Sequence, residues 1–414
     1  MAKLAIKGGK PIRTKPFHKW PIYGEEEEKA LLEVLRSGLW GIGGKKNEEF
    51  AEEFAKYQGA KYGVTCANGT VAIEISLRAL NIGFGDEVII PAYTFMATAQ
   101  AVLYVNAFPK FVDIDPDTYT MDPREVEKAI TSKTKAIIPV HIGGAPANMD
   151  EIMEIAERHN LYVIEDAAQA HLAEYKGKIV GGIGDLGIFS FQESKNMTAG
   201  EGGIITTNNE ELAEKCYSLR EHGRLRDKPW YFHNILGWNY RMTEIQAAIL
   251  REQLKKLPKI TEERRRNAEY LTSILKEVDG ISPGYTAPYV KHAYHLYLID
   301  YYPDKVGLSK ELFIKAVNAE GVPLSGGYMW PAYTNPVFSN PKNMPICPYK
   351  CPLIGREIKY FKGMCPNAEK LCYETGLWLP GHVLNTNRDE LIDIKKAIEK
   401  VINNAEKISR AFAK

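Results

Sequence analysis

The sequence predicts an α/β protein with a large domain built on a mostly parallel sheet and a smaller α/β domain after it. Two observations predict this fold class. Between about residues 60 and 210, short apolar runs alternate with amphipathic stretches, the order that joins parallel strands through helices. Beyond residue 258, a strand-like run (295–301) precedes a helical stretch (309–320), and a long amphipathic helix (388–411) ends the chain.

The individual elements follow in chain order. Residues 1–24 contain three prolines and are expected to form an extended arm. The acidic run 25–28 starts a helix, because the helix dipole favours carboxylates in the first turn, and Gly38 ends it. A long helix over 243–280 is expected to break at Pro258, which separates a large domain (25–257) from a small one (258–414). The expected strands are 62–65, 88–90, 111–114, 136–142, 162–164, 188–191 and 203–206, and the expected helices include 71–80, 122–130 and 149–159.

Composition excludes several classes of protein. The 414 residues include 53 basic and 52 acidic side chains, so an electrostatic nucleic-acid binder is not expected. No apolar run is long enough to span a membrane, and residues 1–10 lack the apolar core of a signal peptide. Six cysteines are too few for a disulfide scaffold. We therefore expect a cytoplasmic protein of enzyme size without nucleic-acid or membrane partners.

Polar groups follow three strands of the predicted sheet. Gly69 and Thr70 stand where a helix begins, and backbone N–H groups at a helix start can bind an anion. Asp166 follows the strand 162–164, and Lys195 lies in a loop after Ser190. Each has a plainer interpretation: a helix cap at residues 68–70, a second cap at Asp166, and a solvated loop lysine at Lys195.

Together the three positions offer an anion cradle, a carboxylate and an amine at the edge where ligands bind in such sheets. Pyridoxal phosphate (PLP) requires these three groups, for its phosphate, its pyridinium nitrogen and its aldehyde. Phe95, after the strand 88–90, is either a flat surface for the cofactor ring or an ordinary core aromatic.

Seven stretches then carry a family resemblance from about Leu4 to the C-terminal helix: ANGTVAIEISLRAL, GDEVIIPAYTF, FVDIDPDTY, IEDAAQAH, FSFQESKNMTAGEGG, REHGR and GWNYRMTEIQAA. The chain resembles the DegT/DnrJ/StrS family of PLP-dependent sugar aminotransferases. The resemblance implies the PLP-dependent transferase fold of type I, the fold of aspartate aminotransferase.

The resemblance also implies roles for single residues. Lys195 would form the Schiff base with PLP, and Asp166 would hold the pyridinium nitrogen. Gln169 would contact the ring's phenolic oxygen, and Phe95 would stack on the ring. Gly69, Thr70 and Ser190 would hold the phosphate. The resemblance also implies a homodimer with shared active sites, in which Asn239 would reach the phosphate bound by the other subunit.

The implied activity is ping-pong amino transfer from glutamate or glutamine, through pyridoxamine phosphate, to a keto sugar or a keto cyclitol such as scyllo-inosose. The sugar is either free or nucleotide-linked. Two alternatives stay open. One is a PLP-dependent dehydratase or aromatising lyase of the 3-amino-5-hydroxybenzoate synthase kind. The other is a non-catalytic ligand-binding protein on the same fold.

Four cysteines, Cys347, Cys351, Cys365 and Cys372, lie close together in the sequence of the small domain. Their spacing is not typical of zinc sites, and ordinary thiols are favoured over metal ligands. Arg241 either binds a substrate carboxylate or pairs with an acidic side chain.

Overall fold

The computed structural model describes residues 4–340, 343 and 359–412. A seven-stranded sheet with the order β1-β9-β8-β5-β4-β2-β3 forms the centre of the molecule. The five strands from β8 to β3 run parallel, and β9 is antiparallel to both of its neighbours, so the sheet is mostly parallel as predicted. The strands are β1 (Tyr62–Cys66), β2 (Glu87–Pro91), β3 (Phe108–Val112), β4 (Thr134–Ile137), β5 (Tyr162–Asp166), β8 (Leu186–Ser190) and β9 (Gly203–Thr207).

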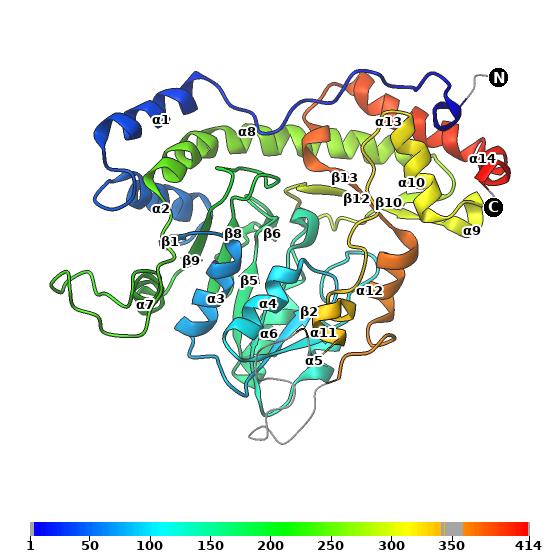
Figure 1. Cartoon of the computed structure of the whole chain (residues 1–414). Coiled ribbons are helices and arrows are strands. Elements are labelled where there is room, and N and C mark those ends of the chain that lie inside the picture. The colour runs from blue at the N-terminus through cyan, green and yellow to red at the C-terminus, as the bar shows by residue number, and fades with distance from the viewer. Residues whose placement is uncertain (1–3, 341–342, 344–358, 413–414) are drawn as a thin grey trace.

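Helices cover both faces of this sheet (Figure 1). Successive side chains of a strand point to opposite faces, so in β2 Val88 and Ile90 pack into one core cluster and Ile89 packs into the other. The first face is covered by α3 (Gly69–Ala79), α4 (Met96–Tyr104) and α7 (Glu210–Arg220). The second is covered by α2 (Lys46–Tyr57), α5 (Pro123–Ala129), α6 (Met149–His159) and the first half of α8 (Glu244–Leu275).

A smaller α/β unit surrounds an antiparallel sheet with the order β10-β12-β13. Its strands are β10 (Ile281–Pro283), β12 (Leu296–Tyr301) and β13 (Gly376–Pro380), and its core also contains α10 (Lys310–Ala319), α13 (Arg388–Ile402) and α14 (Ala405–Phe412). A third sheet joins β11 (Val290–Lys291), β6 (Glu174–Tyr175) and β7 (Lys178–Ile179). The other described α-helices are α1 (Glu25–Ser37), α9 (Pro303–Val306), α11 (Pro336–Ser339) and α12 (Pro366–Lys370).

The predicted break at Pro258 is wrong, because α8 continues through this proline. A proline inside a helix loses one hydrogen bond and costs about 3 kcal/mol. The neighbouring side chains of Leu254, Leu257 and Ile260 are buried, and their burial offsets that cost. The helix passes over both sheets (Figure 1). A domain boundary between residues 257 and 258 would therefore lie inside this helix, and that boundary stays a prediction.

Strand β3 also differs from its expected range of 111–114. It begins at Phe108 and includes Pro109, which sequence reasoning treated as outside the strand. Strand β3 lies at the edge of the sheet and pairs with β2 alone. On its other side there is no strand to which Pro109 would have to donate a backbone hydrogen bond, so a proline is tolerated there.

The N-terminal arm connects the smaller unit to the loop that carries Lys195. Leu4 is buried in the core of the smaller unit. Farther along, Trp20 donates from Nε1 to the carbonyl oxygen of Glu193 at 2.9 Å. Both chain ends lie at the smaller unit (Figure 1). The helix α1 begins at Glu25 and ends before Gly38, which has a left-handed conformation (φ 72°), as predicted.

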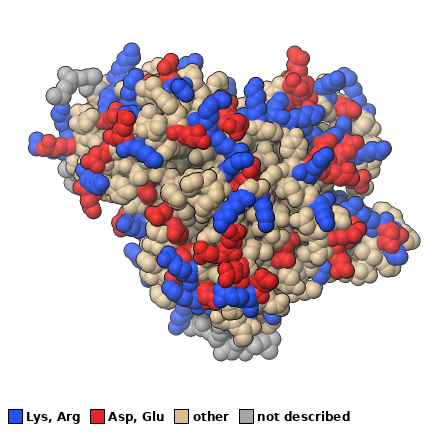
Figure 2. All heavy atoms as spheres, turned by 180° about the vertical axis from the view of Figure 1, so that it is seen from behind, with Lys and Arg blue, Asp and Glu red and all other residues tan. Residues whose placement is uncertain are grey.

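Acidic and basic side chains are interspersed over the face seen in Figure 2, in keeping with their nearly equal numbers. None of the helices in the described part of the chain combines the length and the apolar content that crossing a bilayer requires. The cytoplasmic location stays a prediction.

Candidate active site

Asp166 occupies the end of the central strand β5 and is 6% exposed. Its Oδ2 accepts a hydrogen bond from Thr98 Oγ1 at 2.8 Å, and its Oδ1 accepts one from the backbone N–H of Ala168 at 3.2 Å. Burial raises the pKa of the carboxyl, while the Thr98 hydrogen bond and the charge of Lys195 act in the opposite direction. Asp166 is therefore a buried carboxylate with two donors, and no helix begins in the residues directly after it that it could cap.

Lys195 lies in the loop between β8 and β9 and is partly buried. Burial lowers the pKa of its ammonium group to about 8, although the charges of Asp166 and Glu201 oppose this change. The solvated-lysine interpretation does not describe this environment. A lysine with such a pKa is partly a free amine near neutral pH, the form that attacks an aldehyde.

Three histidines near this loop are buried: His171, and His292 and His295 on either side of Ala293, whose carbonyl oxygen accepts from Asn196 Nδ2 of the loop at 2.9 Å. Burial lowers the pKa of His292 to about 3, and burial together with the charge of Lys195 lowers that of His171 to about 3. The pKa of His295 is lowered for the same two reasons. These side chains are neutral, and the two within electrostatic range of Lys195, His171 and His295, therefore add no positive charge near it. Sequence reasoning missed them because they come from two distant segments.

Gln169 is fixed by two hydrogen bonds. Its Oε1 accepts from the backbone N–H of Gly143 at 2.7 Å, and its Nε2 donates to Tyr328 Oη at 3.2 Å. Sequence reasoning identified Gln169 and did not identify Tyr328, because the segment around Tyr328 has no motif that marks it.

The predicted phosphate cradle brings two of its residues together. Helix α3 begins at Gly69, and Asn68 caps it by accepting the N–H of Val71 at 3.1 Å. The N–H groups of the first turn at Gly69 and Thr70 remain available for another acceptor. A Cβ atom on Gly69 would lie 2.9 Å from Ser190 Cβ, so only glycine lets the helix start approach the end of β8 this closely.

Phe95 and Asn239 are both exposed. Phe95 is the residue before α4 and is 60% exposed, so it is not a core aromatic and its ring is free for a ligand. Asn239 forms a backbone bridge with Glu221, and the carbonyl oxygen of the next residue, Tyr240, accepts from Ala67 N at 2.8 Å. No described contact brings the Asn239 side chain to Lys195 or Asp166.

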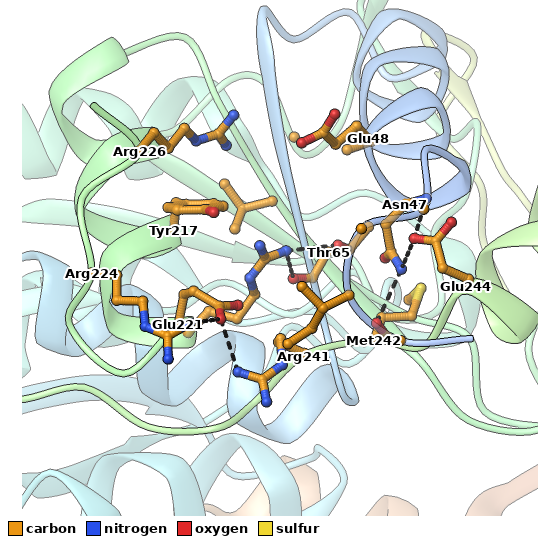
Figure 3. A pocket seen from close by; sticks show the side chains of 18 of the residues that line it. Asn47, Glu48, Thr65, Tyr217, Glu221, Arg224, Arg226, Arg241, Met242 and Glu244 are labelled. Carbon is orange, nitrogen blue, oxygen red and sulfur yellow. Dashed lines mark hydrogen bonds and ion pairs between the residues drawn. The ribbon is translucent and has the colours of Figure 1, made fainter. Parts of the chain in front are cut away.

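A cavity of about 410 Å³ lies elsewhere, between the start of α2 and the segment after α7 (Figure 3). None of the eight predicted site residues lines it. Arg241 and Arg224 both reach Glu221, at 2.9 and 3.4 Å, so Arg241 has an acidic partner within the chain. Arg220 donates to Thr65 on the same wall.

Two of the four clustered cysteines can be described. Cys365 and Cys372 are buried, and burial raises the pKa of both thiols, to about 12 for Cys372. Cys347 and Cys351 lie outside the described residues. Within the residues that the structure describes, no group of three or more His, Cys, Asp or Glu side chains is arranged to hold a metal ion.

Comparison with known proteins places these features in a family. The profile of the DegT/DnrJ/EryC1/StrS aminotransferase family matches residues 21–399. The L-glutamine:scyllo-inosose aminotransferase of Streptomyces griseus is 36% identical, over 99% of this chain and 100% of that protein. The L-glutamine:2-deoxy-scyllo-inosose aminotransferase of Streptoalloteichus tenebrarius is 41% identical, over 81% of this chain and 83% of its own length.

Among solved structures, 3-amino-5-hydroxybenzoic acid synthase superposes with a TM-score of 0.84 at 31% identity, covering 95% of this chain and all of that one. These matches agree with the mostly parallel sheet and with the family that the sequence resembles. The chain is an aminotransferase and belongs to the DegT/DnrJ/EryC1/StrS aminotransferase family.

Proposed function

We propose that the chain uses PLP to transfer the amino group of L-glutamine or L-glutamate to a keto cyclitol or keto sugar, with pyridoxamine phosphate between two half-reactions. The observation that supports this most is a partly buried lysine, whose pKa is about 8, within electrostatic range of the buried carboxylate of Asp166. The named relatives support glutamine as donor and a cyclitol ketone as acceptor.

The residues present fit PLP. The close approach of Gly69 to Ser190 leaves backbone and hydroxyl donors for a phosphate group. Buried Asp166 suits a protonated ring nitrogen, since a buried carboxylate is stabilised by a cationic partner. We assign the phosphate contacts to Gly69, Thr70 and Ser190.

Around the ring we assign Gln169 to the phenolic oxygen and the exposed ring of Phe95 to stacking. Asn239 is assigned to the phosphate of the other subunit, because its side chain is exposed and has no described partner in its own site.

When bound, PLP supplies the electron sink that stabilises negative charge on the α-carbon of the amino donor. The chain supplies the proton transfers. Lys195 Nζ takes the proton from that carbon as a free amine and returns it as an ammonium group, and a pKa of about 8 makes both forms accessible near neutral pH. Asp166, kept ionised by Thr98, holds the proton on the ring nitrogen.

The test is transfer of label. The purified chain, supplied with PLP, L-glutamine labelled with ¹⁵N at the α-amino group and scyllo-inosose or a panel of keto sugars, should form a ¹⁵N-labelled amine. The control variant Lys195→Ala should form none. A wild-type chain that transfers no label from glutamine or glutamate to any acceptor would contradict the proposal.

A second candidate function is aromatisation, which the likeness to 3-amino-5-hydroxybenzoic acid synthase favours. The mass of the product separates the two. Amino transfer keeps the hydroxyl groups of the acceptor, and aromatisation removes water from it.

We also propose a homodimer with shared active sites. Large apolar side chains are exposed on two parts of the surface, α1 with the loop after it and the segment between α7 and α8. A patch of this kind is costly to leave in water and is typical of subunit interfaces. The most exposed of these residues are Leu35, Trp40, Ile42, Trp230, Tyr231 and Leu236.

A further inference from the structure

The segment 325–332, which we call the strap, crosses from the smaller sheet to the large one. At its first end Ser325 exchanges two backbone hydrogen bonds with Trp378 of β13, at 2.9 and 2.8 Å. At its other end Ala332 N donates to the carbonyl oxygen of Ala92, directly after β2, at 2.9 Å. The strap is therefore tied to both sheets, and Tyr328 stands in the middle of it.

The Tyr328 ring is held from two sides. The centroid of the Tyr328 ring lies 5.1 Å from that of Tyr93 and 4.8 Å from that of Trp378, and both ring pairs are edge to face. The preceding Gly327 has φ +76°, and a Cβ atom there would lie 2.9 Å from Tyr93 Oη. Only glycine allows this close approach, so the strap packs directly against Tyr93 and Trp378 at this position.

Tyr328 is one of two groups that fix the amide of Gln169. The backbone N–H of Gly143 can only donate, so the oxygen of the amide must face Gly143 and its nitrogen must face Tyr328. One N–H of Gln169 is donated to Tyr328 Oη, and the second N–H is left over. This second N–H is the one donor of the amide that these two hydrogen bonds leave for a ligand.

We propose that Tyr328 is a positioning residue that holds the Gln169 amide with its second N–H directed at the phenolic oxygen of the bound cofactor. Tyr328 acts through Gln169 and links this contact to the smaller sheet. The inference rests on the proposed function, because it needs PLP in the site.

The Gln169 side chain is buried, with 7% of the residue exposed. Without an acceptor at Tyr328, its first N–H would remain unpaired in this buried position. The amide would rotate to share its donors, and the ring oxygen would lose part of its hydrogen bond. Burial keeps the Tyr328 phenol protonated by raising its pKa, so Tyr328 remains neutral beside Asp166.

The test compares Tyr328→Phe with the matched control Tyr93→Phe. Both remove one hydroxyl from the same aromatic cluster, and the hydroxyl of Tyr93 contacts Trp378 Nε1 and the backbone of Tyr328 instead of Gln169. The readout is the pKa at which the visible absorbance of the PLP-loaded chain changes, measured without substrates. A weaker donor to the phenolic oxygen favours its protonated form, so Tyr328→Phe should raise this pKa by about half to one unit. Tyr93→Phe leaves the Gln169–Tyr328 hydrogen bond in place and should therefore shift this pKa by less than Tyr328→Phe does.

A double-mutant cycle shows whether Tyr328 acts through Gln169. The double variant with Gln169→Ala should show the same pKa as Gln169→Ala alone. A full additional shift would overturn the inference, and so would an unshifted Tyr328→Phe. Tyr328→His keeps a ring nitrogen as acceptor and should shift the pKa by less than Tyr328→Phe, and a larger shift would also overturn it.

The outcomes also separate this inference from the proposed function. If the wild-type chain develops no visible absorbance with PLP, the proposed function fails. If the wild-type chain binds PLP and Tyr328→Phe titrates as the wild type does, only the role of Tyr328 is overturned.

Discussion

Thr98 donates a hydrogen bond from Oγ1 to Asp166 Oδ2 across 2.8 Å, and the hydroxyl of Thr94 lies 2.9 Å from Thr98 Oγ1. Because the proton of Thr98 is used on Asp166, Thr94 is the donor in the second contact. Two hydroxyls beside the first turn of α4 thus stabilise an ionised carboxylate that burial alone would favour in its protonated form.

Replacing Thr98 should therefore shift the pH dependence of the enzyme. Thr98→Val removes the donor to Asp166, so the pKa of Asp166 rises and the acidic limb of kcat/KM moves up by about half to one pH unit. Thr94→Val, which loses only the contact to Thr98, should shift the limb by less. A pH profile of Thr98→Val that coincides with the wild type would show that this hydrogen bond does not set the ionisation of Asp166.

Removing the charge of Asp166 should weaken catalysis directly. A hydrogen bond to a charged group contributes about 1.5–3 kcal/mol, so Asp166→Asn should lower kcat by roughly ten- to 150-fold or more. Asp185→Asn is a suitable control, because Asp185 accepts from the N–H of Val163 at the other end of β5. The first half-reaction with glutamine, followed by absorbance, gives the rate. Equal losses in both variants would indicate a structural effect on β5 and not a role at the ring nitrogen.

The buried histidines should make the protein sensitive to acid. His292 has a pKa of about 3 in the folded protein and about 6.5 when unfolded, so the unfolded chain binds more protons between these values. Stability is then lost as the pH falls from about 6.5 towards 3, by about 1.4 kcal/mol per pH unit for this histidine.

His292→Asn keeps an acceptor for the N–H of Tyr294 and should flatten the pH dependence of the unfolding free energy by this amount. Urea denaturation across the interval measures it. A His292→Asn variant with the wild-type slope would mean that His292 is charged in the folded protein or solvated.

Shared active sites can be tested by mixing inactive variants. Lys195→Ala removes the amine, and Asn239→Asp places a negative charge at the proposed phosphate contact. If Asn239 serves the other subunit, a mixed dimer contains one site that lacks both residues and one intact site. Refolding an equal mixture should then restore about a quarter of the wild-type activity. No recovery, with mixed dimers demonstrated by mass, would place Asn239 outside the other subunit's site.

Much of the fold and the central residues of the site could be predicted because their signals are local. Asp166 ends an apolar run, and Gly69 precedes an amphipathic helix, so each could be placed on a sheet edge from its neighbours alone. The parallel topology then brings such edges together, which is why Gly69 and Ser190 meet.

The remaining features depend on packing that the sequence does not display. Thr98 contributes from inside α4, and Tyr328 from an irregular strap 159 positions after Gln169. The predicted break at Pro258 is wrong because a proline usually ends a helix, whereas here the burial of the neighbouring leucines outweighs that preference. Phe95 could not be assigned from its residue type, since exposure alone distinguishes a ring in the core from one open to a ligand.

The most direct test of the central claim is reduction of the PLP-loaded protein with borohydride, followed by peptide mapping. The account predicts a stable cofactor adduct on Lys195, in a protein whose visible absorbance is lost on reduction and is also changed by glutamine. An adduct on another lysine, or a protein that stays colourless with PLP, would contradict it.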